Sequence, residues 1–301
     1  MGSAAGVLYR VIAVSVAVVA TVAALGLYAG ISSGSASPVL VGAGDIATCR
    51  GNGDEATAKL LENIHGTVFT AGDNAYPDGT ARDFADCYGP SWGRFRERTR
   101  PAIGNHEYGT PGASGYFGYF GTAAGPSSRG YYSYDKGEWH VVVLNSVCEE
   151  VGGCGSDSPM VDWLEKNLAA NSGKRCTLAY FHYPLFSSGE HGNQVQMKPT
   201  WKALFAADAD LIVSGHDHDY ERFAPQKPDG TKDAYRGIRE FVVGTGGGEQ
   251  RPFGRVEPNS QVRKANAPGV LKLTLKPGGY AWKFVPVAGQ TFTDSGSRSC
   301  H

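Results

Sequence analysis

The chain has no excess of charge of either sign. Its 301 residues include 28 lysines and arginines and 29 aspartates and glutamates, for a net charge of −1. Proteins that bind nucleic acid through their overall charge carry a strong basic excess. The sequence therefore gives no reason to expect nucleic acid as a partner, and its length suits one large domain or two small ones.

Cysteine patterns typical of metal sites are also missing. The six cysteines include no Cys-x-x-Cys pair, and none lies near residue 30, which argues against a lipid-modified lipoprotein. An even number of cysteines in an exported chain predicts three disulfides. Sequence alone leaves their connectivity open. We expect the pairs Cys148–Cys154, which would close a glycine-rich loop, Cys49–Cys87 and Cys176–Cys300.

One long apolar run stands near the N-terminus, at residues 11–29, directly after Arg10. A cleaved secretory signal has this basic-then-apolar order, and the small residues 34–36 would form its cleavage site. An uncleaved membrane anchor is the other interpretation, because the run approaches the length of one membrane span. Both interpretations place the rest of the chain in the secreted fraction or at the extracytoplasmic face of the membrane. We therefore divide the chain into residues 1–37, a signal or anchor with a Ser/Gly linker, and a folded domain at 38–301.

Short apolar stretches predict strands at residues 39–43, 67–71, 176–181 and 211–214. Helical spacing predicts helices at 54–64, with Asp54 as the N-cap, and at 82–95, 161–170 and 199–207. Residues 270–287 are typical of a hairpin that turns at 277–279. No internal repeat is present. This order of elements predicts an α/β fold of mixed α+β character, a four-layer sandwich of two mixed β-sheets flanked by helices.

Five short strings rich in metal-binding side chains follow one another along the chain, and four of them come at predicted strand ends. They are GDIA at 44–47, GDNAY at 72–76, GNHE at 104–107, FHYP at 181–184 and GHDH at 215–218. They supply carboxylate, amide, imidazole and phenol groups, which hard and borderline metal ions prefer. Together they favour two adjacent metal ions and metal-assisted hydrolysis of a phosphate ester.

These strings resemble the sequence blocks of the calcineurin-like metallophosphoesterase superfamily over residues 40–225. The tyrosine of GDNAY is similar to that of the purple acid phosphatase branch, here in a bacterial-type exported form. The first block departs from the pattern, because it reads Asp45-Ile46-Ala47 where the family has DxG. It also lacks the DxH histidine that other branches have. Tyr76 would take the place of that histidine on the first metal.

The resemblance implies a ligand set for two metals. Asp73 would bridge both ions through its two carboxylate oxygens, and the remaining ligands would be Asp45, Tyr76 and His218 for the first metal and Asn105, His182 and His216 for the second. A phenol is a poor ligand at neutral pH unless the cation is strongly Lewis-acidic, so Fe(3+) is expected at the tyrosine site. A divalent Fe, Zn or Mn ion is expected at the other. Each of these residues also has an interpretation without metal. Asp73 would be a turn residue, the histidines would be solvated, and Tyr76 would pack beside Pro77 in a loop.

Two further histidines resemble catalytic residues of the family. His106 follows Asn105 and would contact the phosphoryl group or the leaving oxygen. His191 lies nine residues after His182, where the family has a substrate-binding or proton-donating histidine, although a solvated loop residue fits equally well. The glycines at 244–248 would present backbone N–H groups to an oxyanion or form a turn. The Gly/aromatic run 115–121 would line the site or pack as core.

The resemblance implies an acid phosphatase, which is a phosphomonoesterase. A metal-activated hydroxide would make an in-line attack on the phosphorus of a small phosphate ester. No phosphoenzyme is expected, because no Ser or Cys nucleophile is needed. Two alternatives remain open. One is a phosphodiesterase with the same metal centre, and the other is a non-catalytic protein that binds metal or phosphate at the cell surface.

Overall fold

The computed structural model describes residues 1–2 and 36–301, and the chain from Ser37 to His301 forms one compact unit. The apolar run at 11–29 lies outside the described residues, so its signal and anchor interpretations both stay predictions. None of the described helices combines the length and the apolar character that crossing a bilayer requires.

Two mixed sheets form the centre of this unit. The first has the strand order β13-β12-β11-β1-β2-β3, with bounds β1 (Val39–Ala43), β2 (Thr67–Ala71), β3 (Thr99–Ala102), β11 (Gly269–Lys276), β12 (Gly279–Pro286) and β13 (Ser295–Ser299). The second has the order β10-β8-β9-β7-β6-β5-β4, with bounds β4 (Tyr132–Lys136), β5 (Trp139–Val143), β6 (Cys176–Tyr180), β7 (Leu211–Ser214), β8 (Tyr220–Phe223), β9 (Arg239–Val243) and β10 (Ser260–Lys264). Strands β1, β2 and β3 run parallel, as do β5, β6, β7 and β9. The predicted hairpin is confirmed as β11 and β12.

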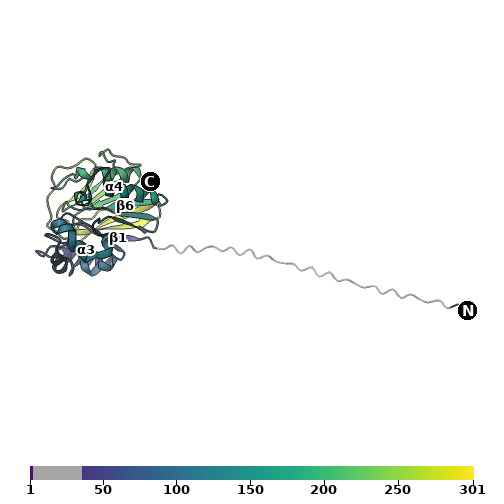
Figure 1. The fold of residues 1–301 in the computed structure, drawn as a ribbon, viewed down its shortest axis with the longest axis horizontal. Helices are drawn as coiled ribbons and strands as arrows, with labels where there is room; N and C mark the ends of the chain where they lie inside the picture. The colour runs from purple at the N-terminus through teal and green to yellow at the C-terminus, as the bar shows by residue number, and fades with distance from the viewer. Residues whose placement is uncertain (3–35) are drawn as a thin grey trace. The chain divides into compact units, whose positions relative to one another are not determined.

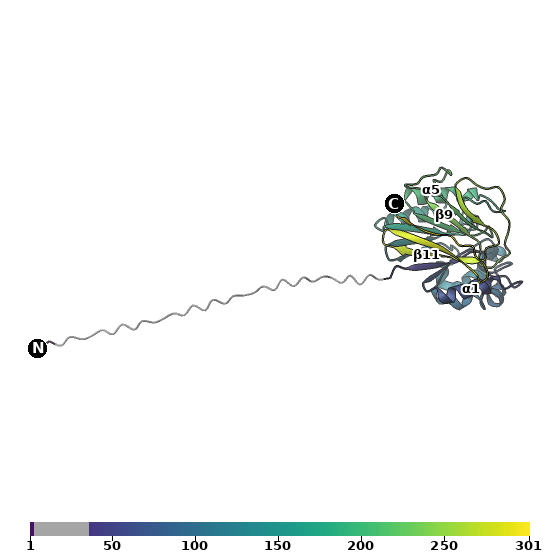
Figure 2. The same ribbon diagram turned by 180° about the vertical axis from the view of Figure 1, so that it is seen from behind.

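Helices cover the outer faces of both sheets. Figure 1 shows α4 (Pro159–Ala170), the sheet that contains β6, the sheet that contains β1, and α3 (Ser114–Phe120) as successive layers. Figure 2 shows α5 (Lys198–Ala206) and α1 (Gly53–Asn63) on the two opposite outer sides. The predicted four-layer α/β sandwich of two mixed sheets is therefore confirmed.

The strand β5 shows how the layers are built. Val141 and Val143 belong to the apolar cluster between the sheets, whereas Val142 packs in the cluster under α4 and α5. Successive side chains of a strand point to opposite faces, so both faces of β5 must be apolar. This is why the sequence of this strand is a continuous rather than an alternating apolar run.

Two helix predictions are wrong in detail. The helix expected at 82–95 is broken into α2 (Ala81–Asp83), a π-helical turn (Phe84–Tyr88) and a 3₁₀ segment (Trp92–Arg98). Pro90 lies at the break, where its ring and missing N–H prevent a continuous helix. The N-cap of α1 is Asn52 and not Asp54, which lies buried in the first turn.

All three expected disulfides are present. Cys49–Cys87 joins the loop after β1 to the π-helical turn, and Cys148–Cys154 closes the loop before α4. Cys176–Cys300 connects β6 of the second sheet to the residue that follows β13 of the first. The described residues contain no free cysteine. Three disulfides fit a protein of an oxidising, extracytoplasmic compartment.

A buried carboxylate also joins the two sheets. Asp294 accepts hydrogen bonds from the Tyr220 hydroxyl at 2.7 Å, from Arg222 Nε at 2.7 Å and from Trp282 Nε1 at 3.0 Å. Tyr220 and Arg222 lie on β8 of the second sheet, whereas Trp282 lies on β12 of the first. Burial raises the pKa of Asp294, but the hydrogen bonds from Arg222 and Tyr220 outweigh it and leave the pKa below its usual value.

Asp294→Asn should destabilise the protein by about 3 kcal/mol, because the change leaves the Arg222 guanidinium without its anion. Thermal unfolding should show a melting temperature lower by about 5 to 10 °C. Because the folded-state pKa is depressed, the contribution of Asp294 is present above about pH 4 and is lost as the pH falls through the folded pKa. The difference in melting temperature between wild type and Asp294→Asn should therefore become smaller in acid.

The control is Asp86→Asn, which removes an exposed ion pair with Arg82 and should cost under about 1 kcal/mol. Equal melting temperatures for Asp294→Asn and the control would show that Asp294 does not hold the sheets together.

Candidate metal centre

All seven predicted metal ligands lie at the carboxyl ends of parallel strands. Asp45 follows β1 and Asp73 with Tyr76 follows β2, while the other four follow strands of the first or second sheet: Asn105 after β3, His182 after β6, and His216 and His218 after β7. Since the carboxyl ends of the two sheets face each other here, the structure brings the seven together. This is the place where α/β folds commonly bind their ligands.

Three of these residues adopt a backbone conformation that L residues rarely use. Asp45, Asp73 and His216 have φ values of 59°, 48° and 72°. Asp and His are among the residues most often found in this left-handed region, and each turns the chain sharply away from its strand. The glycine before Asp73 is also required. Gly72 has φ 83°, and a Cβ atom there would lie 2.6 Å from the Cβ of His182.

The phenol of Tyr76 is the centre of one group of ligand atoms. Its oxygen lies 2.9 Å from Asp45 Oδ1, 3.2 Å from Asp73 Oδ2 and 3.1 Å from His218 Nε2. His218 Nε2 is in turn 3.2 Å from Asp45 Oδ1. The four residues that the family resemblance groups on the first metal therefore form one continuous cluster.

A second group forms around His182. Its Nε2 atom lies 3.0 Å from Asn105 Oδ1 and 3.2 Å from Asp73 Oδ2. The His216 ring lies 5.0 Å from the His182 ring, centroid to centroid. Asp73 thus touches both groups, but only through Oδ2, because Oδ1 accepts a hydrogen bond from the backbone N–H of His106 at 3.0 Å. The expectation that both oxygens of Asp73 face the metals therefore needs correction to one oxygen.

The histidine orientations fit metal binding. Nδ1 of His182 is hydrogen-bonded to the carbonyl oxygen of Ala71 at 2.9 Å, and Nδ1 of His218 to that of Glu249. A carbonyl only accepts, so each Nδ1 carries the proton and each Nε2 lone pair faces the ligand cluster. Ligand atoms of Asp45, Asp73 and His182 lie within 4.8 Å of one another in a buried position. Oxygen and nitrogen donors at this spacing suit hard or borderline cations.

Without metal, the buried carboxylates of the cluster favour protonation of their neighbours. Burial opposes charge on His182, but Asp73 and Asp45 outweigh it and raise the pKa of His182 to about 9. Burial and the neighbouring His182 lower the pKa of His216 to about 3. Burial, Asp45 and Asp73 raise the pKa of Tyr76 well above its usual value. The metal-free cluster therefore holds protons on His182 and Tyr76 that cation binding would release.

Glu107, the last residue of GNHE, was missed as a functional residue in the sequence. Its fully buried carboxylate accepts hydrogen bonds from four backbone N–H groups: Gly104 at 2.7 Å, Asn74 at 2.7 Å, Asp73 at 3.1 Å and Ala75 at 3.2 Å. Burial raises the pKa of Glu107 to about 7, and the negative charge of Asp73 adds to the effect. Glu107 therefore fixes the loops that carry Asp73 and Asn105 relative to each other.

Asp217, which lies between the two histidines of GHDH, has a similar role. It accepts hydrogen bonds from the Ser187 hydroxyl and, at 2.8 Å, from the backbone N–H of His191. The His191 ring consequently stacks on His216 with centroids 4.3 Å apart. On its other side, His191 Nε2 accepts a hydrogen bond from Arg251 at 2.7 Å. His191 is thus an exposed loop residue whose ring is held at the edge of the cluster by these contacts.

The glycine run at 244–248 forms a tight turn and does not present its N–H groups outward. The backbone N–H groups of Gly244, Gly246 and Gly248 donate to the carbonyl oxygens of Asp219, Gly44 and Asp45. A Cβ at Gly246 would lie 2.5 Å from the Gly44 oxygen, so the run must be glycine to pack against the loop of Asp45. The oxyanion interpretation is therefore wrong for these three groups.

The aromatic run at 115–121 packs as core. It forms α3, whose Tyr116 and Phe120 are buried and lie against Phe84 of the π-helical turn. The alternative that this run lines the site is not supported, because none of its residues lines the pocket beside the ligand cluster.

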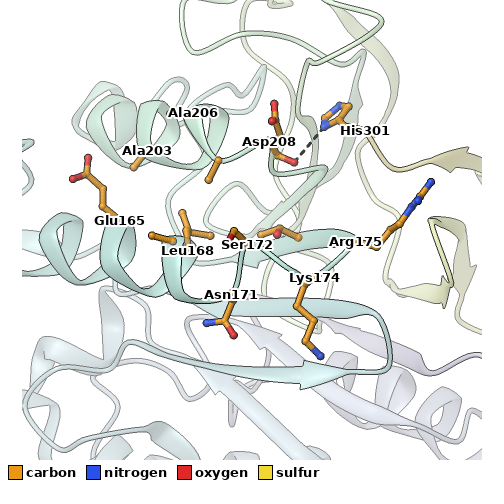
Figure 3. Close-up of a pocket in the computed structure, with 13 residues that line it drawn as sticks. Glu165, Leu168, Asn171, Ser172, Lys174, Arg175, Ala203, Ala206, Asp208 and His301 are labelled. Atoms are coloured by element: carbon orange, nitrogen blue, oxygen red, sulfur yellow. Dashed lines mark hydrogen bonds between the residues drawn. The ribbon is translucent and has the colours of Figure 1, made fainter.

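Two cavities differ in their relation to this cluster. A cavity of about 580 Å³ lies between α4 and α5, with Lys174, Arg175 and His301 in its wall (Figure 3). None of the predicted ligands lines it. Cys176 and Cys300 lie close to the carboxylate of Asp210, but both are in a disulfide and cannot bind metal. A second pocket of about 520 Å³ is lined by Tyr76, His106 and His218, and it opens beside the ligand cluster.

Comparison with known proteins agrees with the geometry. The family model described as calcineurin-like phosphoesterase matches residues 39–220. Purple acid phosphatase 15 of Arabidopsis thaliana is 25% identical over 277 residues, which cover 78% of this chain and 49% of that protein. An uncharacterized protein of Mycobacterium tuberculosis is 29% identical over 201 residues, covering 54% of this chain and 38% of that protein. The chain spans about half or less of the length of these curated relatives.

Solved structures with the same fold include purple acid phosphatase PPD1 from yellow lupin, with a TM-score of 0.66 and 20% identity over 88% of this chain and 54% of that one. GAP50, described as the anchor in the inner membrane complex of Plasmodium, has a TM-score of 0.68 and 14% identity over 89% and 90% of the two chains. At these identities the likeness shows the fold alone.

Glu107→Gln should weaken the site without touching a predicted ligand. An amide has one acceptor oxygen in place of two, so buried N–H groups near Asp73 would lose their partner. We expect a loss of about 2 kcal/mol in the stability of metal-free protein, and a metal affinity lower by about tenfold or more. Melting temperature and metal content after dialysis measure the two effects, with Glu138→Gln in an exposed turn as the control. Unchanged metal affinity in Glu107→Gln would contradict its positioning role.

Proposed function

The chain belongs to the calcineurin-like phosphoesterase family, and from this premise we propose that it is an exported hydrolase of phosphate monoesters with a dinuclear metal centre. The family and the purple acid phosphatase relatives indicate a metal-dependent phosphoesterase. The observation that carries the finer proposal is the convergence of ligand atoms from both sheets on one carboxylate oxygen, Asp73 Oδ2.

We assign one metal position to the Tyr76 group and one to the His182 group. Asp45, Tyr76 and His218 would hold the first ion, and Asn105, His182 and His216 the second, with Asp73 shared. The phenol oxygen of Tyr76, 2.9 Å from Asp45 Oδ1 and 3.1 Å from His218 Nε2, supports Fe(3+) at the first position, because a phenol binds near neutral pH only to a strongly Lewis-acidic cation. A divalent Fe, Zn or Mn ion would suit the oxygen and imidazole donors of the second position.

When bound, two such ions would neutralise phosphate oxygens and lower the pKa of a bound water, which makes hydroxide available for in-line attack. The protein's own residues then have to handle the leaving group. His106 is placed for this task. Its Nδ1 donates to the carbonyl oxygen of Pro77, so Nε2 is the atom that gains and loses a proton. That atom lies 3.8 Å from Asp73 Oδ2 and borders the pocket, where it would donate a proton to the leaving oxygen.

His191 has a different proton arrangement. An arginine only donates hydrogen bonds, so His191 Nε2 accepts from Arg251 and the ring proton is on Nδ1. His191 is therefore better suited to bind a phosphoryl oxygen through Nδ1–H than to supply a proton from Nε2. We propose His106 as the general acid and His191 as a substrate-binding residue.

Export is the remaining part of the proposal. The three disulfides support an oxidising compartment. The apolar run at 11–29 would direct the chain there as a cleaved signal or hold it at the membrane as an anchor. A small phosphate ester is the expected substrate, and comparison of rates on a monoester and a diester separates a phosphomonoesterase from a phosphodiesterase.

Asp73→Asn should lower kcat/KM on a monoester such as p-nitrophenyl phosphate on the order of a hundredfold or more, because a neutral amide is a poor bridge between two cations. Metal content should fall at both positions, while circular dichroism shows an intact fold. Asp78→Asn in the neighbouring exposed loop is the matched control. Near-normal turnover with full metal content would exclude Asp73 as the shared ligand.

Tyr76→Phe tests the ferric position. A ferric phenolate gives a visible charge-transfer band, so iron-loaded wild type should be purple or pink, and the variant should lose the band at matched iron content. The phenyl ring keeps its contacts, including the 4.4 Å approach to the His106 ring, so the metal-free variant should melt close to wild type. Absorption spectra of both proteins show whether Tyr76 is the ligand of the ferric ion. A colourless iron-loaded wild type, or a band that survives in Tyr76→Phe, would refute the assignment.

A further inference from the structure

The pocket beside the ligand cluster is larger than a phosphoryl group requires. Its volume is about 520 Å³, within the range of pockets that bind whole small molecules. Tyr76, His106 and His218 form the wall on the side of the ligand cluster. A further part of the wall comes from residues 48–51 and 247–249 and from Arg251, which no step of the proposed reaction uses. The leaving group of a substrate would extend into this part of the pocket.

Arg251 in that wall is held in place on several sides. Its backbone N–H donates to the carbonyl oxygen of His218 at 3.2 Å, and its guanidinium donates to His191 at 2.7 Å. Glu190 lies 3.7 Å from the same nitrogen. The Arg251 side chain is about one-third exposed and lines the pocket. A cation fixed in this way loses little conformational entropy when it binds an anion.

Arg50 lines the same pocket from the loop that follows β1. The preceding Cys49 is bonded to Cys87, and the backbone N–H of Arg50 donates to Thr48 Oγ1 at 3.3 Å, so the base of the side chain is fixed. Its guanidinium makes no ion pair with any residue that the structure describes. Arg50 is exposed, so a second cation borders the pocket with guanidinium donors that no described residue engages.

Two carboxylates also line the pocket. Asp83 is engaged in its helix cap, where it accepts a hydrogen bond from the backbone N–H of Thr80 at 3.0 Å. Glu249 is exposed, and only its backbone carbonyl is used, by His218. Glu249 would oppose an anion in the pocket, so its removal should strengthen anion binding. The predicted effects of Arg50 and Glu249 thus have opposite signs.

We infer that Arg50 and Arg251 form a subsite for a second phosphoryl group, carried by the leaving group of the substrate. A phosphoryl group offers three oxygens, enough for both guanidinium groups, and carries close to two negative charges near neutral pH. The inference rests on the proposed phosphoesterase function and narrows its substrate class to bisphosphorylated compounds. A carboxylate on the leaving group has the same charge sign but fewer oxygens, and it is the alternative anion to test.

Three matched substrates separate these possibilities: propane-1,3-diol monophosphate, its bisphosphate, and 3-(phosphonooxy)propanoate. Wild type should give the highest kcat/KM on the bisphosphate. In Arg50→Gln the ratio of bisphosphate to monophosphate kcat/KM should fall by about tenfold or more, as expected for loss of a charge-assisted hydrogen bond. In Glu249→Gln the ratio should rise. Arg255→Gln, an exposed arginine in the neighbouring loop that does not line the pocket, is the control and should leave the ratio unchanged.

A binding measurement keeps the test independent of turnover. Propane-1,3-diyl bisphosphonate and propylphosphonate carry two phosphonate groups and one, as analogues of the bisphosphate and the monophosphate without a cleavable ester. Calorimetry gives their affinities for metal-loaded protein. Arg50→Gln should weaken the bisphosphonate by about tenfold and propylphosphonate by less.

The outcomes distinguish the two levels of the proposal. Hydrolysis of all three substrates with ratios that Arg50→Gln does not change overturns the subsite and leaves the phosphoesterase standing. A preference for the carboxylate substrate that depends on Arg50 overturns the phosphoryl assignment. Absence of hydrolysis together with bisphosphonate binding that depends on Arg50 overturns the proposed function and supports the subsite. Equal loss of affinity for both phosphonates in Arg50→Gln overturns the subsite.

Discussion

The carboxylate of Glu107 has no contact with solvent, and four backbone N–H groups surround it. Burying a charge costs several kcal/mol unless hydrogen bonds replace the lost water. Here the hydrogen bonds offset part of that cost, and burial still raises the pKa of Glu107 to about 7. Three of the N–H groups, at residues 73–75, are free because the chain leaves β2 at Asp73 in a left-handed conformation and no longer donates to a neighbouring strand. The sharp turn and the buried acid therefore depend on each other. Without Glu107 the turn that aims Asp73 between the sheets would carry unsatisfied donors.

The ligand cluster is divided between two sheets, so its geometry is only as fixed as the contact between them. Several contacts other than the core hold the sheets in register. Trp139 on β5 donates to the carbonyl oxygen of Lys276 on β11 at 3.0 Å, and Tyr180 on β6 donates to that of Arg100 on β3 at 2.8 Å. Asp294 and the Cys176–Cys300 disulfide add links at the edges. Side chains on loops can converge precisely only when the scaffold beneath them is rigid.

The sequence predicts those features of this site that are local. The strand ends and the polar residues that follow them can be predicted, because a short apolar run followed by Gly-Asp is typical of a strand that ends in a turn. The pairing of Cys49 with Cys87 could be expected but not fixed, because six cysteines allow many pairings. The break at Pro90 within 82–95 could also have been predicted, whereas the π-helical form of Phe84–Tyr88, which packs against the aromatics of α3, could not. The sequence shows Glu107 only as the last residue of the GNHE motif. Its four hydrogen-bond partners can be identified only in the structure. Arg50 and Arg251 share a pocket although 200 residues separate them, and no periodicity marks such a pair.

The order of strands in the first sheet has a consequence for how the chain folds. Strand β1 lies between β2 and β11, so the loop that carries Asp45 has a complete sheet beneath it only after β11 and β12 have been synthesised. Contacts between such distant parts of a chain form slowly, because a long loop must close first. An N-terminal fragment released early would leave one edge of β1 unpaired, which invites aggregation. Assembly late in synthesis, when the last strands arrive, would suit the proposed export, because a chain that is unfolded can be carried across a membrane.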